Sequence, residues 1–286
     1  MANIRLIRRR IRGIQSTSKI TRAMEMIATS KMRRAQERGL AGRPYSEKIH
    51  QVIADLAALP TEGGALHPLL QRRAVNKIAI VHITPDRGLC GGLNTGLNRR
   101  TASFILEQNI PVTLIAVGRK GRDFMRRYGR EIRAEFAGLG DRPGLLDTTP
   151  VSHIIIDDYT NGVIDLVYLV YAQFISTMAQ KPVVQQILPV EPAQIPQAQN
   201  VDYIYEPGPG AVLGELLPRF VEMQVYHAIL ESIASEQSAR MVAMRNATDN
   251  ASELIEELTL MYNKARQEAI TKELLDITGG VEAMAK

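Results

Sequence analysis

The chain has 286 residues, of which 45% are hydrophobic and 23% charged, so it can bury a real core and is long enough for two structural units. Its longest apolar stretch, Ile164–Ile175, is too short and too interrupted by polar residues to cross a bilayer, and its arginine-containing N-terminus lacks the apolar region of a secretory signal. Cys90 is the single cysteine, which excludes an internal disulfide and predicts a small, partly buried residue.

Residues 1–60 are predicted to form a helix, because their apolar residues recur at helical spacing, although in a less regular seam than a coiled coil has. Gly39, Gly42 and Pro44 interrupt the pattern. The proline predicts a kink, since it removes a backbone donor and crowds the preceding turn. The segment Thr61–Gly64 is expected to end the helix. The apolar positions are Ile4, Ile7, Ile11, Ile14, Ala23, Met24, Ile27, Ile49, Val52 and Leu56.

Residues 75–192 alternate between short β-rich runs and helical stretches, which is typical of an α/β domain. The succession of strand, helix and strand favours a largely parallel, Rossmann-like sheet. Residues 61–74 and 193–210, the second rich in proline, are expected to be linkers. Strands are predicted at 77–83, 111–117, 154–156, 165–175 and 183–190, and helices at 94–108 and 118–129.

Residues 211–286 are predicted to form one long helix. Apolar residues alternate at spacings of three and four over about eight heptads, with no proline after Pro218, which is the pattern of a coiled coil. At 1.5 Å per residue, roughly 70 residues make a rod of roughly 100 Å. The heptad positions are Leu213, Leu216, Phe220, Met223, Leu230, Ala234, Met241, Met244, Ala251, Ile255, Leu258, Tyr262, Ala265 and Ala269.

A seam of that length needs a partner, and the N-terminal segment is the stretch of this chain that could supply one. The predicted fold class is therefore α/β, with two long terminal helices that form an antiparallel coiled coil and a Rossmann-like α/β domain inserted between them. The charges agree, because residues 1–50 carry thirteen Lys or Arg against three Asp or Glu, and residues 213–286 carry seven against twelve. The basic excess indicates a further acidic partner or a nucleic acid.

The turn Asp86–Asn94 lies between a predicted strand and a predicted helix, where glycine-rich loops hold phosphate in nucleotide-binding proteins. Its glycines match neither the dinucleotide fingerprint nor a P-loop, and Gly118–Gly121 lacks the same elements, so a structural turn is favoured. The histidines lie on different elements without metal-ligand spacing, and Ser16, Ser18 and Ser30 have no neighbouring His and Asp. The residues thus predict no catalytic centre, no metal site and no cofactor.

Two functional classes can be weighed on these patterns alone. A basic, coiled-coil nucleic-acid-binding protein would place Arg8–Arg12 and Arg33–Arg38 on phosphates, but it leaves the acidic C-terminal helix without a role. A nucleotide-binding enzyme would centre on Gly88–Gly92, where the sequence offers no acid, base or metal ligand.

Three parts of the chain resemble a known family, the gamma subunits of bacterial-type F-type ATP synthases. They are residues 18–36 (SKITRAMEMIATSKMRRAQ), the Asp86–Asn94 turn, and above all residues 239–250 (ARMVAMRNATDN) with 258–279 (LTLMYNKARQEAITKELLDITG). The resemblance extends essentially from end to end. This chain lacks the cysteine pair of the plant relatives, so thiol regulation is not expected.

The resemblance implies the role of a central-stalk rotor shaft. In the family, the terminal helices form a shaft inside a ring of three alpha and three beta subunits, and the inserted domain sits with the epsilon subunit and the c ring. Proton flow turns the c ring and the shaft, which drives the beta subunits through different nucleotide affinities. The implied protein is a non-catalytic subunit without a cofactor, held at the cytoplasmic face of the bacterial cell membrane by the complex.

The resemblance also implies contact residues in two groups, both facing beta subunits. The first group corresponds to positions opposite an acidic beta loop, and the second to positions that hydrogen-bond with another beta loop. The first group is Arg22, Met24 and Lys31, and the second is Arg266, Gln267 and Thr271.

Overall fold

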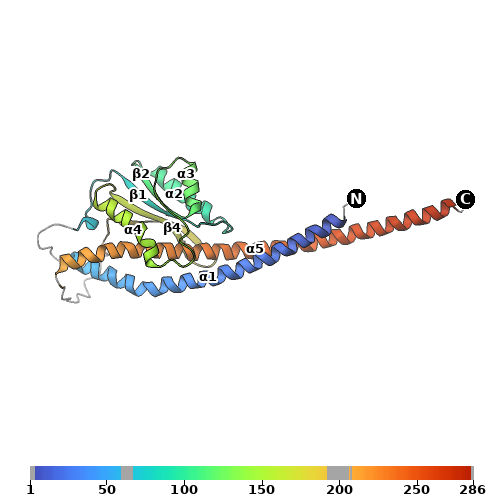
Figure 1. Ribbon diagram of the computed structural model, residues 1–286, viewed down its shortest axis with the longest axis horizontal. Helices are drawn as coiled ribbons and strands as arrows, with labels where there is room; N and C mark the ends of the chain where they lie inside the picture. Colours follow the sequence, from blue (N-terminus) through green and yellow to red (C-terminus); the bar gives the residue numbers. More distant parts are fainter. Residues whose placement is uncertain (1–3, 59–66, 192–205, 207, 285–286) are drawn as a thin grey trace. The chain divides into compact units, whose positions relative to one another are not determined.

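A computed structural model describes residues 4–58, 67–191, 206 and 208–284 (Figure 1). The chain divides into two compact units, which we treat separately: the helix-pair unit, residues 1–27 with 241–286, and the sheet unit, residues 28–240. Among the described helices, none combines the length and the apolar character needed to cross a membrane. The elements in chain order are α1 Ile4–Ala58, η1 Pro68–Leu70, β1 Ile78–Ile83, α2 Leu93–Glu107, β2 Val112–Val117, α3 Arg119–Arg127, β3 Ile132–Phe136, α4 Leu145–Thr160, β4 Leu166–Phe174, β5 Gln180–Leu188 and α5 Pro209–Met284.

The sheet unit is built on a five-stranded sheet with strand order β3-β2-β1-β4-β5. The strand β1 pairs in parallel with β2 and β4, β2 pairs in parallel with β3, and β5 closes one edge antiparallel to β4. Figure 1 shows α2 and α3 against one face of the sheet and α4 against the other. The predicted fold class, α/β with a largely parallel, Rossmann-like sheet between long terminal helices, is confirmed.

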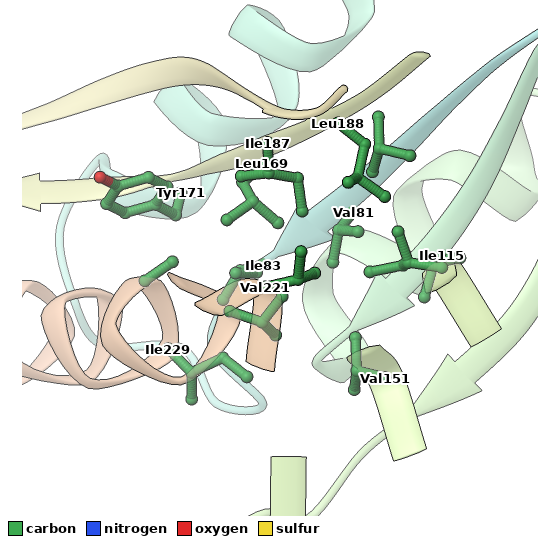
Figure 2. Close-up of a cluster of buried hydrophobic side chains, with 14 of the residues drawn as sticks. Val81, Ile83, Ile115, Val151, Leu169, Tyr171, Ile187, Leu188, Val221 and Ile229 are labelled. Atoms are coloured by element: carbon green, nitrogen blue, oxygen red, sulfur yellow. The ribbon is translucent and has the colours of Figure 1, made fainter. Parts of the chain in front are cut away.

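The alternation of side chains along each strand gives the sheet two separate apolar faces. On one face, Ile78 and Ile80 of β1 pack with Ile105 of α2 and Met125 of α3. On the other face, the alternate residues of β1 join a larger cluster with α4 and α5, shown in Figure 2. Because both faces are covered, the central strands read as continuous apolar runs, as parallel strands do. The labelled members of the larger cluster are Val81, Ile83, Ile115, Val151, Leu169, Tyr171, Ile187, Leu188, Val221 and Ile229.

The predicted strand at residues 154–156 is wrong, because this segment lies inside α4. Three consecutive isoleucines favour a strand by propensity. The burial follows helical spacing instead, since Val151, Ile155 and Tyr159 are all fully buried at intervals of four residues. At the helix start, the Asp147 carboxylate accepts a hydrogen bond from the Gly144 N–H at 2.7 Å. Packing against the sheet therefore overrides the local preference.

The sequence predictions do not include β3, the other edge strand. Its five residues alternate between half-buried and exposed, with Arg133 and Glu135 on the exposed side. An edge strand with one covered face keeps only half of its residues apolar, and a run this short carries a weak signal. Residues 61–66, 193–205 and 207 of the predicted linkers lie outside the described residues, and so does the predicted helix end Thr61–Gly64. The described Pro68–Leu70 form a short 3-10 helix.

The long helices follow the predicted apolar patterns with one local difference. In α5, all six heptad residues from Ala251 to Ala269 are buried or half-buried, while their neighbours are exposed. In α1, the four isoleucines from Ile4 to Ile14 are likewise half-buried. Ala23 and Ile27 are exposed, contrary to prediction, whereas Thr21 is only 8% exposed. Apolar character alone selects the wrong residues here, because a small polar residue occupies the seam. The helix α1 continues through Pro44.

His82 is a buried polar residue in the middle of the sheet unit. Its side chain is fully buried on β1, with Nε2 at 2.9 Å from Asn98 Oδ1 and Nδ1 at 2.9 Å from Thr101 Oγ1, both on α2. Burial lowers the pKa of His82 to about 4, and the Asn98 hydrogen bond opposes that shift only partly. The imidazole is therefore neutral in the folded chain at neutral pH.

Acid is expected to destabilise the chain through His82. Because its pKa is about 6.5 in the unfolded chain and about 4 in the folded chain, the unfolded state takes up the proton first as the pH falls. The resulting loss grows from pH 6.5 to pH 4 and reaches about 3 kcal/mol. Urea unfolding of the wild type and of His82→Gln at pH 7 and pH 4.5 measures the part of the stability loss that is due to His82. A pH dependence that is equally steep in His82→Gln would contradict the assignment.

Candidate partner-contact surfaces

The helix α5 is joined to the sheet by hydrogen bonds as well as by apolar contacts. Ser235 Oγ donates to the Ala172 carbonyl at the end of β4 at 2.8 Å, and Ser238 Oγ donates to the Thr177 carbonyl at 2.8 Å. Both serines are fully buried. Glu231 accepts a hydrogen bond from the Phe174 N–H at 3.3 Å. Three successive turns of α5 are thus bonded to the β4 end and the turn that follows it, so this part of the helix cannot rotate or slide independently of the sheet.

Arg240 forms a buried ion pair on the same side of α5. Its Nη2 lies 2.7 Å from Glu236 Oε1 and donates to the Gly88 carbonyl at 3.1 Å. The two side chains are 11% and 15% exposed. Burial raises the pKa of Glu236, and the Arg240 charge counteracts part of that rise. The guanidinium therefore compensates the Glu236 carboxylate and ties α5 to the Asp86–Asn94 turn.

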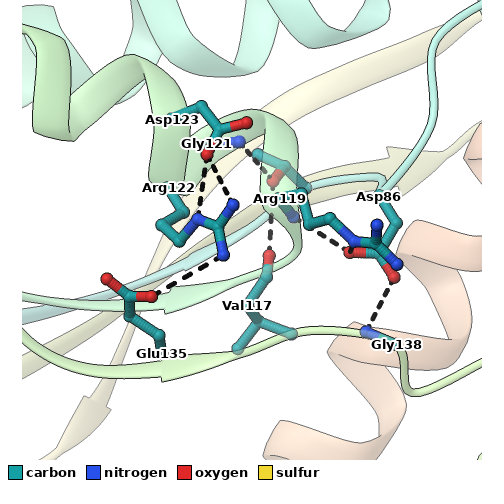
Figure 3. Close-up of polar contacts among 9 residues, drawn as sticks. Asp86, Val117, Arg119, Gly121, Arg122, Asp123, Glu135 and Gly138 are labelled. Carbon is teal, nitrogen blue, oxygen red and sulfur yellow. Dashed lines mark hydrogen bonds and ion pairs between the residues drawn. The ribbon is translucent and has the colours of Figure 1, made fainter.

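The Asp86–Asn94 turn is also held by its first residue, as Figure 3 shows. The Asp86 carboxylate accepts hydrogen bonds from the Arg119 N–H at 2.9 Å and from the Gly138 N–H at 2.8 Å. It thereby joins the end of β1 to the start of α3 and to the loop after β3. Both carboxylate oxygens are used in these structural contacts, which is how a structural turn uses an acidic residue.

Asp141 connects the loop after β3 to both long helices within the sheet unit. Its Oδ2 lies 2.6 Å from Lys31 Nζ on α1, and its Oδ1 accepts a hydrogen bond from Gln237 Nε2 on α5 at 3.2 Å. The Lys31 and Asp141 side chains are 36% and 45% exposed, so the ion pair is solvated and contributes modestly to stability. Its geometry nevertheless brings Lys31 and Gln237 to the same level along the two helices.

Three polar contacts join described residues of α1 and α5 in the helix-pair unit. Thr21 Oγ1 and Thr248 Oγ1 are 2.7 Å apart, and Arg245 Nε donates to Glu25 Oε1 at 2.9 Å. The third contact joins Arg8 and Tyr262. Arg8 donates to the Tyr262 hydroxyl, and this hydrogen bond lowers the pKa of Tyr262. The guanidinium also lies 5.3 Å from the centre of the tyrosine ring.

The last part of α5 has an exposed surface throughout. Every side chain from Ile270 to Val281 is exposed, including Leu274, Leu275 and Ile277, each more than half exposed. Figure 1 shows this end of α5, in red, running past the N-terminal end of α1. A helix that continues for several turns with exposed leucines indicates a surface for another protein.

The chain was compared with known proteins. The family model described as ATP synthase matches residues 3–284. The ATP synthase gamma chain of Dehalococcoides mccartyi (strain ATCC BAA-2266 / KCTC 15142 / 195) is 68% identical over 285 residues, covering 100% of both chains. This chain belongs to the ATP synthase gamma chain family. The gamma chain of Herpetosiphon aurantiacus is 50% identical over 293 residues, covering 99% of each chain.

Solved structures agree with this gamma-chain fold. A chain of the Euglena gracilis mitochondrial ATP synthase, from a structure of OSCP, F1 and c-ring, has a TM-score of 0.66 at 19% identity and covers 98% of this chain and 94% of its own length. A chain from the Tetrahymena thermophila mitochondrial central stalk and c-ring has a TM-score of 0.61 at 23% identity, covering 80% and 99%. These structures show the fold. The gamma-subunit role is supported by the family model and the curated relatives, and the nucleic-acid-binding alternative is not.

The predicted contact residues of this gamma chain fall in both units. Lys31, in the sheet unit, already forms an ion pair with Asp141, whereas Met24, in the helix-pair unit, is half-buried in the seam. The structure leaves the side chains of the remaining four exposed and available to a partner. These four are Arg22, Arg266, Gln267 and Thr271.

The residues that join α5 to the sheet were not among the predicted sites of the gamma chain. A signal for part of them exists in the sequence, because Ser232, Ser235 and Ser238 recur at spacing three beside the apolar seam and are all buried. A buried serine stripe on a long helix indicates a face that contacts backbone rather than solvent. No comparable signal marks Asp141, whose role depends on two helices meeting one loop.

Proposed function

We propose that this gamma chain is the non-catalytic shaft that transmits rotation between the c ring and the ring of three alpha and three beta subunits, with the epsilon subunit at the sheet unit. In this proposal the chain is held at the cytoplasmic face of the bacterial cell membrane through the complex. It binds no nucleotide. Ion-driven rotation of the c ring turns the sheet unit, and α5 turns with it.

One observation carries the proposal, which is the set of bonds between α5 and the sheet. A shaft must not slip where torque enters it. Ser235 and Ser238 donate to backbone carbonyls of the sheet unit, and Arg240 donates to the carbonyl of Gly88. Backbone acceptors are fixed by the sheet, so these bonds resist both rotation and sliding of the helix. Apolar burial of Val221 and Val225 against the sheet adds to the attachment.

The exposed residues support the proposed contacts with the beta subunits. Arg22 presents a positive charge suited to an acidic loop, and Arg266, Gln267 and Thr271 present hydrogen-bonding side chains on the exposed part of α5. Lys31 would contribute to the same acidic contact only by sharing or exchanging its Asp141 partner. We therefore propose Arg22 as the stronger cation of the first group.

Loss of the Arg266 charge is expected to impair coupling more than folding. In Arg266→Gln, ATP-driven proton pumping by membrane vesicles should fall several-fold, while the unfolding free energy of the isolated chain stays within about 0.5 kcal/mol, as for other surface substitutions. Lys264→Gln, an equivalent charge loss at an exposed position two residues away, is the control and should pump normally. A loss of unfolding free energy in Arg266→Gln without a pumping defect would assign Arg266 a merely structural role.

The proposal as a whole is tested by purification of a tagged chain from its native membranes after gentle detergent extraction. Mass spectrometry should find alpha, beta, epsilon and c subunits in the eluate, and the eluate should hydrolyse ATP. Recovery of the chain alone, or with nucleic acid that salt removes, would reject the proposed partners.

A further inference from the structure

The three polar contacts of the helix-pair unit share a single register. In an antiparallel pair of helices, facing residues have numbers that add to a constant. The pairs Thr21 with Thr248, Glu25 with Arg245, and Arg8 with Tyr262 have sums of 269 or 270. They are spread over 18 residues of α1 without any drift in that sum.

Apolar packing alone specifies this register weakly. The seam of α5 repeats with the heptad, so Ala251, Leu258 and Ala265 are equivalent positions one heptad apart. A slip by seven residues would place apolar residues opposite apolar residues again, as in other coiled coils that lack polar specifying positions. It would move α1 by roughly 10 Å along α5.

The polar contacts, by contrast, exist in only one register. A slip by one heptad would place Thr21 opposite Met241 or Ile255, and Thr248 opposite Ile14 or Ala28, according to its direction. In the observed register, one threonine hydroxyl donates to the other, and the acceptor hydroxyl donates to a carbonyl of its own helix, either Ser18 at 3.0 Å or Met244 at 2.9 Å. Opposite an apolar residue, each hydroxyl would keep only the bond to its own helix, and the hydrogen bond between the two helices would be lost.

We propose that these three contacts form a register lock that sets how far α5 projects beyond α1. The observed register places Ile4 opposite Ala265. The exposed residue Gln267 and the exposed stretch that begins at Ile270, with Thr271, follow this point along α5. A slipped register would lengthen or shorten the projecting part by roughly 10 Å and displace these residues from any surrounding protein. The functional meaning of the lock rests on the proposed shaft function, but its existence does not.

Disulfide trapping in the full chain tests the lock directly. In a Cys90→Ala background, Ile11→Cys with Leu258→Cys reports the observed register. The pairs Ile11→Cys with Ala251→Cys, and Ile11→Cys with Ala265→Cys, report slips of one heptad in each direction. In the otherwise unchanged chain, the first pair should cross-link and the slipped pairs should stay at background.

The lock is then removed with Arg8→Met, Thr21→Val and Glu25→Gln. Slipped cross-links should rise at least about tenfold, the population change expected from loss of hydrogen-bonded contacts of ordinary strength. The matched control carries Arg9→Met, Thr17→Val and Glu37→Gln, the same kinds of change at exposed positions of α1. It should behave as the unchanged chain does.

A background level of slipped cross-links in the lock-removed chain would overturn the proposal, because the apolar seam would then be enough to set the register. If that chain loses helix content by circular dichroism, Thr21→Val with Thr248→Val serves instead, and a smaller rise of the same sign is required. Proton pumping by the assembled complex is a separate measurement. If slipped cross-links rise but proton pumping stays normal, the proposed lock is supported and the proposed shaft function is rejected.

Discussion

Gly118→Ala is expected to destabilise the sheet unit by roughly 4 kcal/mol or more, enough to unfold many domains. Gly118 has a φ of +95°, and a Cβ atom there would lie 1.9 Å from the carbonyl oxygen of Thr84. That oxygen is backbone, at the end of the central strand β1, so it cannot move aside. The Gly118 N–H also donates to the Phe136 carbonyl at 2.7 Å, which holds the glycine in place. Urea unfolding at neutral pH measures the loss.

Gly129→Ala separates the steric clash from the backbone conformation. Gly129 has a φ of +65°, but a Cβ atom added there would meet no atom within 4 Å. Its substitution should therefore cost only about 1 kcal/mol, the strain of an L-residue in the left-handed region. Similar losses of unfolding free energy for Gly118→Ala and Gly129→Ala would show that the Thr84 carbonyl does move aside.

Arg240→Met is expected to destabilise the chain by about 3 to 5 kcal/mol, because it leaves the Glu236 carboxylate buried without its cation. The double variant Arg240→Met with Glu236→Leu should recover most of that loss, since apolar residues can replace a buried ion pair at little cost. Unfolding free energies of the two single variants and the double variant form the measurement.

The Arg240→Met loss should also shrink in acid. Burial raises the pKa of Glu236, and removing the arginine takes away the charge that opposes this rise. A carboxyl group whose pKa is raised by folding favours the folded state at low pH and disfavours it as the pH increases. The difference between wild type and Arg240→Met should therefore be smaller at pH 5 than at pH 7. A constant difference would indicate that Glu236 is not the group left uncompensated.

The sequence predicts the long helices well, because their signal is repeated. Each heptad of α5 restates the same spacing, so the seam from Ala251 to Ala269 is confirmed position by position. Single short elements lack that redundancy. The isoleucines at 154–156 have strand propensity but lie in α4, and β3 has too few apolar residues to be noticed.

The contacts that join distant parts of the chain are the least predictable features. Thr21 meets Thr248 across more than 200 residues, and Asp141 meets Lys31 and Gln237 only because a loop passes over both helices. Periodicity shows which face of a helix is buried, but it does not show which residues face one another. The proposed contact residues depend on proteins outside this chain, and the resemblance to a family is what suggests them.

The pairing of the two ends of the chain also determines the order in which it can fold during synthesis. The partner of residues 4–25 is the segment 245–265, so the N-terminal seam must wait while more than 200 further residues are translated. At roughly 5–20 residues per second, the delay is roughly 10–40 s. During this time the isoleucines of the first helix are unprotected, and the net charge of +10 on residues 1–50 provides repulsion between nascent chains. The basic N-terminus thus favours solubility on the ribosome before it has any subunit to meet.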